Sequence, residues 1–209
     1  MLQIIEKLNF ARDGYSNFDI YRHLSPGDGH CLIHSVAFSV YPPYRTKQLN
    51  GVAITQRQVV EKFRTDIANR LERVDIRTGR SLYDTVARGG LRNLGLADPE
   101  YYSLDALQKL LRSSNNLGQE ILVVLENLLN INIFVLDHST QDVIHHGVNN
   151  DNRRSIILYY TGQHYDAITR KVGADGIHVT LLKETDSLIK FLRLRIKNRP
   201  KDYNKQTSK

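Results

Sequence analysis

The sequence predicts an α+β fold, with a small and mostly antiparallel sheet packed between helices. Two observations carry this prediction. Apolar residues recur at helical spacing through the first 130 residues, whereas short runs rich in β-branched residues, separated by turn-forming residues, follow from Ile131 onward. Helices first and strands afterwards are typical of the α+β class. At 209 residues with 41% hydrophobic side chains, the chain is long enough for one domain with a real core.

Helical patterns fill the first part of the chain. They begin near Leu2, Cys31, Thr55, Ser81, Ser103 and Ile121. The second pattern follows the turn-forming stretch Ser25–Gly29 and ends before Pro42, which cannot continue a helix without strain. The third begins with a capping box, because Thr55 is followed three residues later by Gln58. Its apolar face is expected to include Val59, Val60, Phe63, Ile67, Leu71 and Val74.

Short strands are expected after residue 130. They cover 131–136, 142–146, 155–160, 165–169 and 177–182. The segment 191–197 leaves two structures open, because apolar and basic residues alternate as in a strand, while Leu188, Leu192 and Ile196 keep a helical spacing of four. The polar residues after Pro200 predict disorder.

The positive charge of the chain lies mainly at its C-terminal end. The whole chain carries a net charge of +7, and residues 183–209, with nine basic and three acidic side chains, account for +6 of it. We therefore expect a near-neutral domain over 1–182 and a basic C-terminal tail over 183–209. Binding of nucleic acid or of an anionic membrane is expected only weakly and through this tail, and it remains one alternative function.

The single cysteine and the N-terminal sequence bear on the cellular compartment in which the protein is expected. One cysteine excludes an internal disulfide and a Cys-based zinc site, and fits a reducing compartment. Glu6 and Lys7 occupy the place of a secretory apolar region, so no signal peptide is expected, and no apolar run is long enough for a membrane span. We expect a cytoplasmic protein, acting in a host cell if its source is a virus or a bacterium. His30 and His34 lack further ligands, so no metal is assigned.

Cys31 occupies a position suited to a nucleophile. The sequence Gly27-Asp28-Gly29-His30-Cys31 places the thiol directly after a glycine-bearing loop and at the first turn of an apolar helix. Unpaired backbone N–H groups and the helix dipole favour the thiolate there, and they also provide donors for an oxyanion. The alternative is that Cys31 is a small buried hydrophobic residue.

His164 is the best candidate for the base that such a thiolate needs. It ends a loop between two expected strands, and Asp166 follows two residues later. Residues two apart on a strand face the same side, so Asp166 is placed to orient the imidazole from its far nitrogen. The alternative is a surface histidine beside a solvated aspartate.

Three blocks of the sequence together resemble the signature blocks of the ovarian tumour (OTU) family of cysteine proteases. They are Pro26–Leu32, Leu117–Ile121 and Gly162–Ala167, in the family's order. The resemblance extends over about residues 24–168, and the first and third blocks are the more specific. It implies a papain-like OTU fold and a thiol-dependent deubiquitinase, which hydrolyses the isopeptide bond after the C-terminal glycine of ubiquitin.

The resemblance also implies roles for individual residues. Cys31 matches the family's nucleophile, His164 its general base and acid, and Asp166 the residue that orients the histidine. Asp28 matches an aspartate of the nucleophile loop. The backbone around this loop is implied to form the oxyanion hole, with donors at Gly29, His30 and Cys31.

Two departures from the family pattern concern His30, where the family often has Asn, and Leu117, where it commonly has Trp. The implied partners are ubiquitin or polyubiquitin conjugates, with ubiquitin-like modifiers as further candidates, and no cofactor is implied. A module of the same fold that binds ubiquitin without turnover is the main alternative. Because the ubiquitin tail is basic, carboxylates near the site are candidate contacts. They are Asp98, Glu100, Asp105, Asp137 and Asp142.

Overall fold

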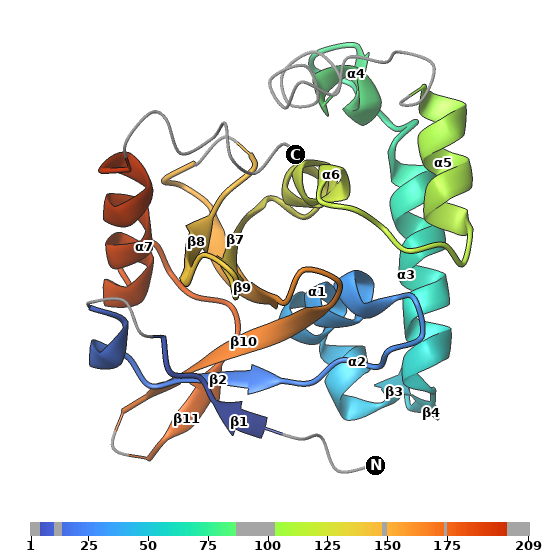
Figure 1. The fold of residues 1–209 in the computed structure, drawn as a ribbon. Helices are drawn as coiled ribbons and strands as arrows, with labels where there is room; N and C mark the ends of the chain where they lie inside the picture. The colour runs from blue at the N-terminus through green and yellow to red at the C-terminus, as the bar shows by residue number, and fades with distance from the viewer. Residues whose placement is uncertain (1–4, 11–13, 87–102, 148–149, 174, 200–209) are drawn as a thin grey trace.

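The computed structural model describes residues 5–10, 14–86, 103–147, 150–173 and 175–199, and Figure 1 shows their arrangement. The helices are α1 Cys31–Val40, α2 Pro42–Thr46, α3 Gln56–Arg70, α4 Leu82–Val86, α5 Leu104–Arg112, α6 Glu120–Leu129 and α7 Ser187–Lys197, with a 3-10 turn at Tyr15–Asn17. The strands are β1 Ile5–Lys7, β2 Ile20–His23, β3 Gln48–Leu49, β4 Val52–Ala53, β5 Val74–Asp75, β6 Arg80–Ser81, β7 Ile131–Asp137, β8 Asp142–Ile144, β9 Arg154–Tyr160, β10 Tyr165–Val172 and β11 Ile177–Val179.

One large sheet organises the molecule. It has seven strands in the order β1-β2-β10-β9-β7-β8, with β11 added to β10. Every pairing is antiparallel except that of β7 with β9, which is parallel. The two hairpins β3–β4 and β5–β6 form separate small sheets. The predicted α+β class with a mostly antiparallel sheet is therefore confirmed, with strand β10 lying between β2 and β9.

Each face of the sheet is covered by helices, and each buries its own hydrophobic core (Figure 1). Alternation along β7 divides its side chains, because Ile133 and Val135 join the core with α1, α3, α5 and α6, whereas Phe134 and Leu136 join the core with α7. A strand buried on both faces reads as a continuous apolar run, which is how β7 and β9 appear in the sequence.

The expected helices after residue 30 are present, and the capping box is formed. Thr55 Oγ1 accepts from the Gln58 backbone N–H at 3.2 Å, and Gln58 Oε1 accepts from the Thr55 backbone N–H at 2.9 Å. The apolar face predicted for α3 is wrong at its last member, because the helix ends at Arg70 and Val74 lies 58% exposed in β5.

The helix expected at the N-terminus is wrong over its described part. Residues 5–7 form β1, which pairs antiparallel with β2 and brings Ile5 opposite His23. Leu2 lies outside the described residues. Ile5 is 50% exposed, so the apolar spacing does not mark a buried helix face. Pairing with the neighbouring strand decides the conformation of this short segment.

The segment 191–197, for which the sequence left strand and helix open, lies in helix α7, which packs against the sheet. Asp186 caps α7 by accepting from the Leu188 backbone N–H at 2.9 Å. Leu188, Ile189 and Leu192 are fully buried in the second core. On the polar side, Arg195 Nε lies 2.8 Å from Asp142 Oδ1. Residues 187–197 of the expected tail thus form part of the core, while residues 200–209 lie outside the described ranges.

Candidate active site

Cys31 is the first residue of α1, and its thiol is partly buried. His30 is the N-cap residue, and its carbonyl accepts from the His34 N–H at 2.9 Å, which closes the first turn. The residues from Leu32 to Ser39 are all buried, so the helix that carries the thiol is anchored along its length. Cys31 therefore sits at the positive end of the α1 dipole, on a helix that is fixed within the core.

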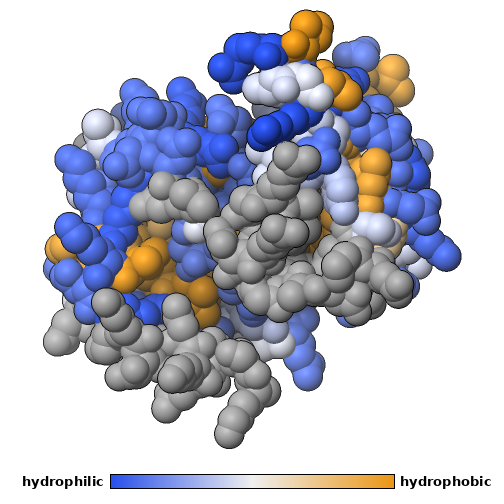
Figure 2. All heavy atoms as spheres, turned by 90° about the horizontal axis from the view of Figure 1, so that it is seen from above, coloured by the Kyte–Doolittle hydropathy of each residue, from blue (hydrophilic) through white to orange (hydrophobic). Residues whose placement is uncertain are grey.

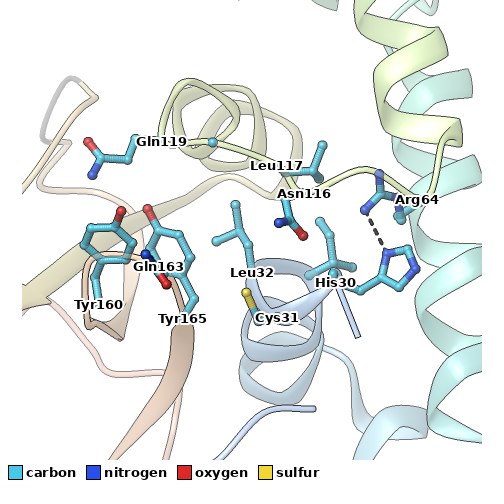
Figure 3. A pocket seen from close by; sticks show the side chains of 13 residues that line it. His30, Cys31, Leu32, Arg64, Asn116, Leu117, Gln119, Tyr160, Gln163 and Tyr165 are labelled. Carbon is cyan, nitrogen blue, oxygen red and sulfur yellow. Dashed lines mark hydrogen bonds between the residues drawn. The ribbon is translucent and has the colours of Figure 1, made fainter. Parts of the chain in front are cut away.

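The thiol lines a narrow cavity of about 90 Å³ between the N-terminus of α1, the segment before α6 and the turn between β9 and β10 (Figure 3). The lining residues are Gly29, His30, Cys31, Leu32, Ile33, Arg64, Asn116, Leu117, Gly118, Gln119, Tyr160, Gln163 and Tyr165. Figure 3 shows the Cys31 sulfur between His30 on one side and Tyr165 on the other. All three sequence blocks therefore contribute to one cavity.

Gly29 allows the nucleophile loop to approach the segment before α6. Its φ is +85°, in the left-handed region that side chains rarely adopt. A Cβ added here would lie 3.1 Å from Asn116 Oδ1 and 3.4 Å from the Ser114 carbonyl oxygen. Both its conformation and its close neighbours thus require a glycine at this position.

His164 is held by a buried carboxylate. Its Nε2 lies 3.1 Å from Asp166 Oδ1, and the Asp166 side chain is fully buried whereas that of His164 is 28% exposed. Oδ1 also accepts from the Ser25 backbone N–H at 2.7 Å, and Oδ2 accepts from Arg22 Nε at 2.7 Å. An acceptor at Nε2 favours the tautomer protonated there, which leaves Nδ1 as the basic nitrogen.

Ser35 connects the segment that contains His164 to helix α1, which carries Cys31. Its Oγ lies 2.8 Å from the Cys31 carbonyl oxygen and 3.0 Å from the Tyr165 carbonyl oxygen. The Ser25 hydroxyl is also within 2.8 Å of it. Since Gln163 and Tyr165 line the cavity with Cys31, the turn that carries His164 lies at the cavity wall.

Asp28 organises the nucleophile loop from within. Its Oδ1 accepts from the His30 backbone N–H at 3.0 Å, and its Oδ2 lies 3.1 Å from His34 Nε2. Partial burial raises the pKa of Asp28, but the hydrogen bonds from His34 and His30 outweigh this and lower it below its usual value. Asp28 is therefore a carboxylate at neutral pH.

His34 is a neutral packing residue in this network. Burial lowers its pKa, and the opposing effect of Asp28 is smaller. Its Nδ1 lies 2.7 Å from the Tyr44 hydroxyl. A neutral ring that donates from Nε2 to Asp28 and accepts from Tyr44 at Nδ1 satisfies both contacts.

The His30 side chain is directed away from the thiol. Its Nδ1 lies 2.9 Å from Arg64 Nη1, as the dashed line in Figure 3 marks. Its backbone N–H is already bound to Asp28. Of the three donors that the resemblance implies for an oxyanion, the N–H groups of Gly29 and Cys31 are therefore the ones that remain candidates.

Two of the five acidic residues expected to face a basic substrate serve the fold instead. Asp137 is buried and accepts from the Thr140 backbone N–H at 2.8 Å, within the turn that follows β7. Asp142 is buried and paired with Arg195. Asp105 is exposed in the first turn of α5, and Asp98 and Glu100 lie outside the described residues.

Three residues of the site were not predicted from the sequence. Ser35 gives no signal, because serine is common on helices. Arg22 gives none either, because nothing local relates it to Asp166, which lies 144 residues away. Arg64 could have been found, because it lies among the apolar positions of α3 in the sequence. The structure shows that its side chain is only 2% exposed.

Within the described ranges, no group of three or more His, Cys, Asp or Glu side chains is placed to hold a metal ion. No helix in the same ranges is both long and apolar enough to span a membrane.

No family model and no curated protein matches the chain, whereas solved structures do. An ovarian tumour (OTU) domain in complex with ubiquitin has 14% identity and a TM-score of 0.49, over 92% of this chain and 90% of that one. The viral OTU domain protease from Dera Ghazi Khan virus has 15% identity and a TM-score of 0.43, over 73% and 90% of the two chains. The Hazara virus OTU bound to ubiquitin has 19% identity and a TM-score of 0.41, over 82% and 91%. These three solved structures are OTU domains.

Proposed function

We propose that this chain is a cysteine-type deubiquitinase of the OTU kind, with Cys31, His164 and Asp166 as its catalytic residues. The observation that supports this most directly is the shared cavity. A thiol at a helix N-terminus lines it, and the turn that carries a carboxylate-bound histidine forms its wall. Acyl transfer by a thiol requires a nucleophile, a base and a group that orients the base, and Cys31, His164 and Asp166 are the proposed members of this set.

The proposed reaction has two halves. The Cys31 thiolate attacks the carbonyl carbon of the C-terminal glycine of ubiquitin, and His164 protonates the departing lysine amine, so that a thioester forms. His164 then takes a proton from water, the hydroxide attacks the thioester, and the thiol is released with the ubiquitin carboxylate. The backbone N–H groups of Gly29 and Cys31 are the proposed donors to the oxyanion in both halves.

The narrowness of the cavity supports a glycine at the acyl position. A cavity of about 90 Å³ beside Cys31 has room for an extended backbone without bulky side chains. Ubiquitin or polyubiquitin conjugates are the proposed substrates on the basis of the three sequence blocks, and ubiquitin-like modifiers ending in two glycines are further candidates.

Ubiquitin carrying a C-terminal propargylamide tests this proposal, because the alkyne captures a catalytic thiol. The chain has one cysteine, so any thiol adduct is assigned to Cys31 without further mapping. We expect an adduct with the wild type, none with Cys31→Ala, and a strongly slowed reaction with His164→Gln. His138→Gln serves as the matched control, because His138 is exposed outside the cavity. A folded wild type that binds ubiquitin but forms no adduct would instead support the non-catalytic ubiquitin-binding module.

A further inference from the structure

Arg64 is a buried cation with an unusual set of partners. It lies on α3, is 2% exposed and lines the cavity of Cys31. Its hydrogen-bond partners among the described residues are backbone carbonyls and one imidazole, rather than a carboxylate. Burying a guanidinium is costly unless each N–H finds an acceptor, and here the acceptors come from both walls of the cavity.

Three of these acceptors belong to the end of α5 and the segment after it. Nε donates to the Leu111 carbonyl at 2.8 Å, and Nη2 donates to the carbonyls of Leu110 at 3.0 Å and Asn115 at 3.1 Å. The last carbonyls of a helix have no partner within the helix and favour a cation. Arg64 therefore caps α5 and at the same time fixes the start of the 115–119 segment, of which residues 116–119 line the cavity.

The fourth acceptor belongs to the nucleophile loop. Nη1 lies 2.9 Å from His30 Nδ1, and His30 is the residue that immediately precedes Cys31. Because a guanidinium only donates, Nδ1 must accept, so the ring proton of His30 lies on Nε2. The ring orientation and the tautomer of His30 are thus both set by Arg64.

The two segments that Arg64 binds are the same two that touch at Gly29. Gly29 approaches Asn116 and Ser114 from the loop before Cys31, and Arg64 donates to the carbonyl of the neighbouring Asn115. A single side chain thus fixes the distance between the cavity wall and the backbone N–H groups proposed as oxyanion donors. Its charge also faces the cavity in which negative charge develops on sulfur and oxygen.

We propose that Arg64 is a positioning residue for acyl transfer, which locks the nucleophile loop through His30 to the 115–119 wall of the cavity. This inference rests on the proposed function. Loss of Arg64 is expected to impair attack on an acyl group, because this step needs the oxyanion donors. The reactivity of the thiol itself is expected to change little, because His164 and Asp166 are held by other contacts.

The experiment compares Arg64→Gln and Arg64→Lys with Arg70→Gln, an exposed arginine on the same helix, after thermal unfolding has shown which variants are folded. We measure kcat and KM on a fluorogenic ubiquitin C-terminal amide, and the rate of alkylation by iodoacetamide. We expect kcat to fall about 10- to 100-fold in Arg64→Gln, with partial rescue in Arg64→Lys. Alkylation is expected to change less than about threefold, and Arg70→Gln to match the wild type.

Two results would overturn the inference: a kcat within about twofold of the wild type in a folded Arg64 variant, or equal losses of kcat and alkylation, which indicate a merely structural role. The nitrogen shifts of His30 provide a readout that does not involve ubiquitin. We expect Nδ1 unprotonated and Nε2 protonated in the wild type, and the opposite tautomer would contradict the arrangement. A wild type that is inactive on ubiquitin but shows this His30 tautomer would refute the proposed function and leave the Arg64 contact established.

Discussion

Arg22 Nε donates to Asp166 Oδ2 over 2.7 Å, and this contact joins β2 to β10 across 144 residues of sequence. The Asp166 carboxylate is fully buried, so its negative charge depends on the donors around it. The Arg22 guanidinium also lies over the Tyr159 ring, 5.0 Å from its centroid. The residue that orients His164 is thus itself held by a strand from the N-terminal part of the chain.

Replacement of Arg22 by Met is therefore expected to weaken both the fold and the reaction. Asp166 would keep its contacts with Ser25 and His164 but lose its charged partner, which is expected to cost about 1–3 kcal/mol of unfolding free energy. The orientation of His164 is also expected to loosen, so kcat should fall. Urea denaturation and ubiquitin-amide hydrolysis measure the two effects, with Arg80→Met, an exposed arginine, as the control. An unchanged urea midpoint would show that Asp166 does not need Arg22.

Two glycines of the nucleophile loop are expected to respond differently to alanine. Gly29 has a φ of +85°, and a Cβ added to it would lie 3.1 Å from Asn116 Oδ1, whereas Gly27 has no atom within 4 Å of such a Cβ. Gly29→Ala is expected to lower stability by about 1–2 kcal/mol and to reduce kcat by at least about tenfold, because the loop must shift. Gly27→Ala should leave both quantities close to wild type. Equal effects of the two substitutions would contradict the close packing of Gly29 against Asn116.

Stability is expected to decrease as the pH falls from 6.5 towards 4. Burial lowers the pKa of His23 to about 4, with a smaller contribution from His178, and burial likewise lowers that of His146 to about 4. The unfolded chain binds these protons near the ordinary value of 6.5, so their contribution to stability is complete above that pH and is lost as the pH falls to the folded-state value.

Urea midpoints measured at pH 7.5, 6 and 5 test this dependence on pH. We expect the midpoint to fall over the series, and His23→Gln to reduce the fall, because an amide does not titrate. His138→Gln, at an exposed histidine, should retain the wild-type dependence. A midpoint independent of pH in the wild type would contradict the burial of neutral histidines.

Leu192 and Leu194 test whether α7 belongs to the core. Leu192 is fully buried in the second core, whereas Leu194 is 56% exposed on the same helix. Leu192→Ala is expected to lower the unfolding free energy by about 2–4 kcal/mol, and Leu194→Ala by less than about 1 kcal/mol. For the same reason, a chain ending at residue 182 is expected to be strongly destabilised. A truncated chain as stable as the full one would instead support the predicted domain boundary at residue 182.

The elements that the sequence predicts well are those specified by local interactions. The capping box at Thr55 acts within a few residues of itself, and α3 begins where the sequence places it. The position of Cys31 at the start of α1 follows likewise from a glycine-bearing loop before an apolar run. The contact of Asp166 with His164 is predictable for a similar reason, because residues two apart on a strand face the same side.

The remaining features depend on contacts between distant residues. β1 shows apolar spacing like that of a helix, and only pairing with β2 makes it a strand. Residues 183–197 carry the charge of a solvated tail, yet Leu188 and Leu192 are buried while Arg195 pairs with the buried Asp142. The contact of Arg64 with both cavity walls is non-local in the same way. The residues adjacent to them in the sequence do not predict which distant residues they contact.

The central place of β10 in the sheet has a consequence for the timing of synthesis. The ribosome produces Cys31 early, but the gap between β2 and β9 is filled only when residues 165–172 have been translated. Until then β2 has no partner on that side, and the thiol lacks the histidine and the aspartate that are proposed to act with it. A nascent chain is therefore expected to carry an unassisted thiol through most of translation, and to acquire its reactivity only as the last strands emerge.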